Sequence, residues 1–199
     1  LRDVGTLSVL DVKRGDIGST MAGYAQAYLS DGAPLCADSI TVSPYLGYGS
    51  LAPALELADS SGRGVFVLAL TSNPEGAAIQ HAVSGERAVA AGVVEGVTAS
   101  NAIASGAGEL GSIGLVIGAT VGEAVSRLGI DLLRANGPLL APGIGAQGAG
   151  PGELESVFGA ARRHVLASTS RGVLKAGPSI EALRTAALAA THEAATALR

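Results

Sequence analysis

The sequence has no tryptophan, two phenylalanines and four tyrosines among its 199 residues. So few rings argue against a surface that binds nucleic acid by stacking bases on aromatic side chains. They also leave the core to Val, Leu, Ile and Ala, which are typical of buried parallel strands and of the helices that pack on them. Because 48% of the residues are hydrophobic, we expect one folded domain with a sizeable core.

Positive charge and cysteine are also scarce. A net charge of −4 and a pI near 5.3 argue against nucleic acid or anionic membranes as partners, because both attract clustered Lys and Arg. The single Cys36 cannot form an internal disulfide, which favours a reducing, cytoplasmic location. No apolar run approaches the roughly 18 to 20 residues that cross a bilayer, so we expect no membrane segment and no signal peptide.

Short apolar runs alternate with stretches of helical composition along the whole chain. Such alternation predicts a parallel sheet, either an open doubly wound sheet or a closed barrel. We favour the barrel because each run ends in polar or glycine-rich residues, as in barrels whose active site lies at one face. The predicted strands are 7–10, 39–43, 64–70, 113–117, 138–141 and 164–167, and the predicted helices are 19–29, 51–58, one or two within 77–108, 121–128 and 179–198.

Six strand and helix units are fewer than a closed barrel needs. An eight-stranded (β/α)₈ or TIM barrel typically takes about 250 residues. Residues 1–5 are typical of the last turn of a helix that ends at Gly5. We therefore predict that residues 1–199 form a single barrel domain that carries strands 3 to 8 and lacks its first two units.

A charged cluster follows the first apolar run. Side chains alternate along a strand, so Asp11 and Lys13 should project to one side and Val12 to the helix layer. A partly desolvated ion pair there would need a further partner, for which Asp16 is the candidate. The alternative is an ordinary solvated loop, since charged residues are common after strands.

The segment DVKRGDIGST at 11–20 resembles the D-x-K-x-x-D-I-x-x-T signature of orotidine 5′-phosphate decarboxylase. Four further matches follow in the family's order: SPYLG at 43–47, TSNP at 71–74, PGIGAQG at 142–148 and Ser170-Arg171. The resemblance covers nearly the whole chain and is closest to the longer bacterial subgroup, in which Asn is common where this chain has Ser43. The D-x-K-x-x-D core alone is less specific, because related sugar-phosphate decarboxylases and synthases share it.

The resemblance implies a (β/α)₈ barrel that converts orotidine 5′-phosphate to UMP without a metal, a Schiff base or an organic cofactor. It implies that Lys13 stabilises the charge that develops at C6 of the pyrimidine and then delivers the proton there. Asp11 would lie against the substrate carboxylate. Asp16 and Thr20 would reach across a homodimer interface into the partner subunit's site.

The remaining substrate contacts are implied in the same way. Ser72 would bond the pyrimidine. The phosphate would be held by the loops after the last two strands, where barrels commonly bind phosphate and where an arginine offers a planar pair of donors. These residues would be Pro142, Gly143, Gln147, Arg171 and Gly172.

Two alternatives stay open. One is a metal-dependent sugar-phosphate decarboxylase or synthase of the same superfamily, although the three histidines have no metal-ligand spacing and we propose no metal site. The other is a non-catalytic fragment or phosphate-binding module, because the missing strands would bring a further lysine and a ribose-binding aspartate.

Overall fold

A computed structural model describes residues 1–144 and 150–199. Six strands form one sheet in which every pair of neighbours is parallel, and their order in space is their order along the chain. A doubly wound sheet would reverse its strand order at a switch point, whereas a barrel adds each new strand beside the previous one. The strands are β1 (Val9–Arg14), β2 (Ser39–Val42), β3 (Gly64–Leu70), β6 (Ile113–Ile117), β7 (Leu139–Pro142) and β8 (Val165–Ser168).

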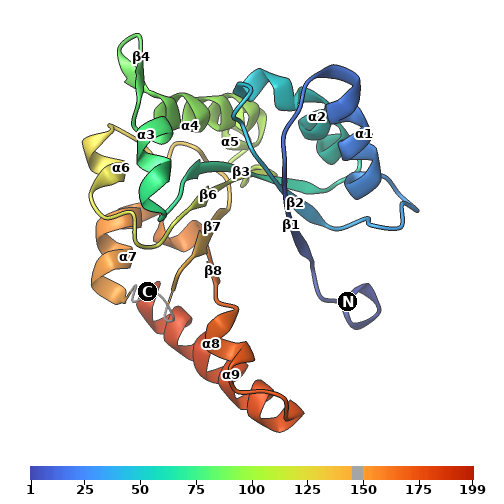
Figure 1. Cartoon of the computed structure of the whole chain (residues 1–199), viewed down its shortest axis with the longest axis vertical. Helices are drawn as coiled ribbons and strands as arrows, with labels where there is room; N and C mark the ends of the chain where they lie inside the picture. The colour runs from blue at the N-terminus through green and yellow to red at the C-terminus, as the bar shows by residue number, and fades with distance from the viewer. Residues whose placement is uncertain (145–149) are drawn as a thin grey trace.

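The sheet curves, with β1 and β8 at its two ends and the main helices on its outer side (Figure 1). This confirms the prediction of an α/β fold in which six consecutive strands form part of a barrel. The helices are η1 (Arg2–Val4), α1 (Gly18–Leu29), η2 (Tyr48–Leu51), α2 (Ala52–Ser60), η3 (Pro74–Gly76), α3 (Ala77–Gln80), α4 (Val89–Ser100), α5 (Ala102–Gly106), α6 (Ala124–Arg127), α7 (Pro151–Phe158), η4 (Gly159–His164), α8 (Arg171–Leu174) and α9 (Ile180–Ala197).

Several regions differ from the predicted elements, including the helices α7 and α8, which were not predicted. A two-stranded hairpin, β4 (Val83–Ser84) and β5 (Arg87–Ala88), interrupts the helical stretch expected over 77–108, and Gly85 turns it with a φ of 67°. The helix expected over 121–128 contracts to α6, because glycines with positive φ stand on both sides of it.

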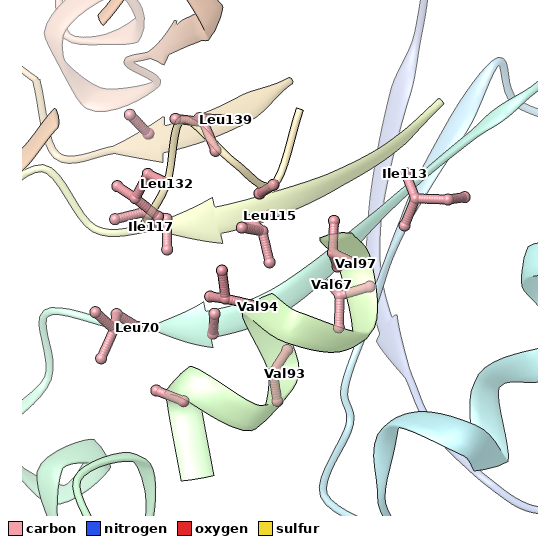
Figure 2. Packing of buried hydrophobic residues seen from close by; sticks show 14 of the residues in the cluster. Val67, Leu70, Val93, Val94, Val97, Ile113, Leu115, Ile117, Leu132 and Leu139 are labelled. Atoms are coloured by element: carbon pink, nitrogen blue, oxygen red, sulfur yellow. The ribbon is translucent and has the colours of Figure 1, made fainter. Parts of the chain in front are cut away.

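The hydrophobic core lies between the sheet and the helices. Figure 2 shows side chains of β3 and β6 packing against α4, with Val67 and Leu115 facing Val94 and Val97. The buried Asn101 fastens the end of this layer, because its amide donates 2.8 Å bonds to the carbonyls of both Ile113 and Ala135. Among the described residues, no helix is long and apolar enough to cross a membrane.

The opposite face of the sheet carries a different set of residues. Phe66 and Val116 are buried but lie outside the helix-side core, and Thr41, the partner of Phe66 in register, is buried between Ile40 and Val42. Alternation along the strands therefore assigns these three side chains to the concave face. In a barrel this is the interior, and its carboxyl end is where sites are built.

Candidate active site

The charged cluster lies at the carboxyl end of β1. Leu10 and Val12 pack against the core, whereas Asp11 and Lys13 are exposed and point the other way, as the alternation predicts. The Lys13 ammonium donates a hydrogen bond to Oδ2 of Asp11 and forms an ion pair with it. The side chain of Lys13 is 50% exposed and that of Asp11 is 60% exposed, so the pair is open to a ligand.

Thr41 of β2 completes this cluster. Its hydroxyl donates a 2.8 Å hydrogen bond to Oδ1 of Asp11 and accepts a 3.0 Å bond from the backbone N–H of Lys13. The regular pairing of β1 with β2 breaks between Leu10 and Arg14, and Lys13 adopts a φ of 47°. A non-glycine residue in this left-handed region is strained, and such strain is common at functional sites.

Two opposing effects act on the Asp11 carboxyl. Partial burial raises its pKa, but the hydrogen bonds from Lys13 and Thr41, together with the positive charge of Lys13, outweigh this and lower the pKa below its usual value. Asp11 is therefore a carboxylate at neutral pH. A carboxylate fixed beside an ammonium can repel the carboxylate of a substrate and, at the same time, stabilise the ammonium next to it.

The loop after β1 lies against the end of β2. A Cβ atom on Gly15 would stand 2.2 Å from the carbonyl oxygen of Ser43, so only glycine fits there. The Asp16 carboxylate accepts a 2.8 Å bond from the N–H of Ile17, and Thr20 is exposed in the first turn of α1. The described contacts place neither residue on the Asp11–Lys13 pair.

Ser72 follows β3 in a loop that its neighbours hold rigidly. Gln80 accepts a 3.0 Å bond from the N–H of Thr71 and donates a 2.7 Å bond to the Thr71 hydroxyl. That hydroxyl donates in turn to Asn73 at 2.6 Å. Ser72 is exposed between these two anchored residues, so its side chain is available to a ligand.

The ends of β7 and β8 meet around a small cavity of about 120 Å³, lined by Pro142, Gly143, Ile144 and residues 168–171. Of the predicted phosphate residues, Pro142, Gly143 and Arg171 are thus brought together. Gly172 lines a larger neighbouring cavity of about 810 Å³ between β8, α8 and α9. Gln147 lies outside the described residues.

Thr41 and Gln80 were not predicted as site residues. Thr41 carried a signal, since it is a polar residue between the apolar Ile40 and Val42 and alternation places it on the face of Asp11. Gln80 carried none, because eight residues of loop and helix lie between it and Thr71. Among the described residues, no group of three or more His, Cys, Asp or Glu side chains could hold a metal ion.

The strand order and the charged strand ends define an α/β barrel-type protein with a polar site at the carboxyl edge of its sheet. The sequence profile of the Orotidine 5′-phosphate decarboxylase / HUMPS family matches residues 1–186, and the chain belongs to this family. It is 60% identical over 188 residues to the orotidine 5′-phosphate decarboxylase of Streptomyces coelicolor and 58% identical to that of Salinispora arenicola.

Solved structures agree with this assignment. A crystal structure from Streptomyces avermitilis is 57% identical, with a TM-score of 0.91 over 99% of this chain and 67% of that one. Leishmania donovani OMP decarboxylase is 30% identical, with a TM-score of 0.72 over 97% of this chain and 69% of that one. The matches to the two bacterial decarboxylases cover 94% of this chain but 65% of their length.

Proposed function

We propose that this chain forms the larger part of an orotidine 5′-phosphate decarboxylase, which converts orotidine 5′-phosphate to UMP in pyrimidine biosynthesis. The observation that carries the proposal is the Asp11–Lys13 pair, bonded at the carboxyl end of β1 inside the signature of this family. The 60% identity to a curated decarboxylase supports the same substrate and reaction. A cytoplasmic location is part of the proposal.

In the proposed reaction, the bond between C6 and the carboxylate breaks, CO₂ leaves, and the electron pair remains on C6. The Lys13 ammonium stabilises this charge and then donates a proton to C6, and solvent reprotonates the amine. Asp11 lies against the departing carboxylate, which favours its expulsion, and it forms an ion pair with the Lys13 ammonium. Charged groups fixed before the substrate arrives need no reorganisation during the reaction.

The rest of the substrate would be held along the sheet edge. Arg171 and the turn at Pro142 and Gly143 bind the phosphate, with Gly172 beside them, and Ser72 bonds the pyrimidine. The cavity between the β7 and β8 loops supports the phosphate assignment, because its lining brings backbone groups of a glycine turn to an arginine. Gln147 belongs to the same proposal through its place in the family's loop.

A homodimer is also part of the proposal, with Asp16 and Thr20 serving the partner's site. Three large apolar side chains beside the site support an interface there: Ile17, Tyr45 and Leu46 are 62%, 74% and 53% exposed. If Asp16 acts across the interface, mixing inactive Lys13→Ala and Asp16→Ala subunits should restore about a quarter of the sites, because half of the dimers are then hybrids with one intact site. No restored activity after verified exchange of subunits would contradict this arrangement.

The main test is the decarboxylase assay with Lys13→Ala. General acid catalysis contributes roughly 10²- to 10⁴-fold, and we expect a loss of that order with the fold retained. Lys175 is the only other lysine in the sequence and lies outside the proposed machinery, so Lys175→Ala is the matched control. Near-normal turnover by Lys13→Ala would overturn the assignment.

We further propose that two βα units preceding β1 complete the barrel. This is tested by assaying the chain alone and the chain joined to the part of the Streptomyces coelicolor relative that it does not match. Turnover by the joined form alone supports the proposal, and equal turnover by both contradicts it. Activity that a chelator abolishes would instead favour the metal-dependent sugar-phosphate alternative, and phosphate binding without turnover in either form would favour the non-catalytic module.

A further inference from the structure

The hydroxyl of Thr41 occupies an unusual place in the structure. Its side chain is 1% exposed, yet it bonds to two parts of an exposed ion pair. We infer that Thr41 is a positioning residue of the site, which fixes the Asp11 carboxylate and the Lys13 backbone together so that the ammonium is held in one place. This inference rests on the proposed decarboxylase function, in which Asp11 and Lys13 perform the chemistry.

The bonds form a closed ring. The N–H of Lys13 donates to the Thr41 hydroxyl, the hydroxyl donates to Oδ1 of Asp11, and Oδ2 of Asp11 accepts from the Lys13 ammonium. Lys13 is therefore tied to Asp11 at both its backbone and its side-chain end. A hydroxyl can link the two because it accepts and donates at once, which neither a methyl group nor an ammonium can do.

The backbone of Lys13 explains why such a link is needed. Its φ of 47° lies in the left-handed region, and a non-glycine residue stays there only when its surroundings hold it. The regular ladder of β1 with β2 is interrupted between Leu10 and Arg14, and within this interruption the N–H of Lys13 bonds to the Thr41 side chain. Thr41 thus provides at this point the bond that holds the strained residue.

Other threonines show what a purely structural hydroxyl does in this protein. Thr98, Thr191 and Thr196 each donate to the carbonyl of the residue four positions earlier in their helix. That is the ordinary local way for a threonine to satisfy its hydroxyl. Thr41 instead bonds two groups thirty and twenty-eight residues away, both of which belong to the proposed catalytic pair.

Two further facts define what Thr41 contributes. Among the described residues, the charged group bonded to Asp11 is Lys13 of the same strand, and β2 supplies only the neutral Thr41. Removing the hydroxyl should therefore loosen the carboxylate without changing any charge. Valine has nearly the shape of threonine, so Thr41→Val changes little except the hydroxyl.

The test compares Thr41→Val, Thr41→Ser and the control Thr98→Val in the form of the protein that shows turnover. A bond to a charged group typically contributes enough to change kcat roughly 10- to 100-fold, and we expect Thr41→Val to lose that much with KM changed less than about threefold. Thr41→Ser should recover most of the loss, and Thr98→Val should behave like the wild type. Titration of the Asp11 carboxyl by carbon NMR should show a higher pKa in Thr41→Val.

The outcomes are separable. An unchanged Asp11 titration in folded Thr41→Val overturns the inference, as does a loss of kcat that serine does not restore. A raised Asp11 pKa without turnover in any form, wild type included, supports the positioning role and overturns the proposed function instead. Should Thr41→Val fail to fold, Thr41→Ala and Thr41→Ser give the same comparison, since these two differ by the hydroxyl alone.

Discussion

At the β1–β2 edge of the sheet, the polar groups of the site are already bonded to one another, whereas at the β7–β8 edge they line a small cavity. Asp11, Lys13 and Thr41 form a closed ring of hydrogen bonds around a strained backbone. Arg171 lies across the sheet from them, and none of the described residues forms an ion pair with its guanidinium.

This difference corresponds to two kinds of work. Groups that stabilise a developing charge act best when they are fixed in advance, because their reorganisation would add to the barrier. Groups that grip a phosphate gain their bonds from the ligand itself, and remote binding energy can then serve to position the reacting part. The proposed substrate would span the two edges, with its phosphate at Arg171 and its pyrimidine at Lys13.

The largest effect on ligand binding should follow from removing the phosphate arginine. Bonds from a charged donor typically contribute about 1.5 to 3 kcal/mol, so Arg171→Ala should weaken binding of UMP roughly 10- to 150-fold. Calorimetry with UMP measures this, and uridine, which lacks the phosphate, should bind both forms alike. Arg184→Ala, on the exposed side of α9, is the matched control, and an equal loss with uridine would contradict the assignment.

A smaller effect is expected between the two edges. Ser72 would contribute one neutral hydrogen bond to the pyrimidine, so Ser72→Ala should lower kcat/KM roughly 2- to 12-fold. The loss should appear mainly in KM, because the ring is bound before and during the reaction. Steady-state kinetics measure this, with Ser156→Ala as a control at another exposed serine. A loss confined to kcat would instead assign Ser72 to the chemical step at the β1–β2 edge.

The strained backbone of the β1 edge can be tested without any substrate. Glycine adopts the positive φ of Lys13 readily and alanine does not. The free energy of unfolding, measured by denaturant titration, should therefore be about 1 kcal/mol higher for Lys13→Gly than for Lys13→Ala. Because both variants lack the ammonium, the comparison isolates the backbone. At an ordinary exposed strand position, the alanine variant is more stable than the glycine variant. If Lys13→Ala were likewise more stable than Lys13→Gly, the backbone of Lys13 would be unstrained.

The smallest effect concerns pH. The folded state lowers the Asp11 pKa, so the ionised pair adds stability above the unfolded value near 3.8, and this is lost as the pH falls through the lower folded pKa. Both side chains are half exposed or more, and solvent screening keeps the gain below about 1 kcal/mol. The free energies of unfolding of the wild type and Asp11→Asn should differ at pH 6, and the difference should shrink as the pH falls below 3.8. A difference in unfolding free energy that grows as the pH falls would contradict the downward shift assigned to the Asp11 pKa.

The sequence allowed much of the fold to be predicted. The bounds predicted for β3 and β6 coincide with the observed ones, because each is an unbroken apolar run next to glycine or polar residues. The hairpin of β4 and β5 escaped prediction because two-residue strands have no measurable periodicity. The apolar run predicted for β1 covers residues 7–10 and passes into Asp11 and Lys13, whereas the observed strand is Val9–Arg14; its renewed pairing with β2 at Arg14 is not revealed by side-chain polarity.

The site was predictable only in part for a similar reason. Alternation correctly placed Asp11 and Lys13 on one side, since this needs only the strand's own geometry. The left-handed backbone of Lys13 and the two bonds of Thr41 depend on the register between β1 and β2, which one sequence does not specify. The anchoring of Thr71 by Gln80 likewise depends on how α3 returns against the end of β3.

The order of the six strands has a consequence for how the chain can fold. Neighbouring strands follow chain order, with β3 pairing with β6 across the small hairpin, and the residues paired in register are 24 to 48 positions apart. Parallel pairing over such separations needs an ordered crossover, which makes it slower than helix or hairpin formation. The sheet can therefore grow by one crossover unit at a time, and the pairing of β3 with β6 closes the longest of these loops.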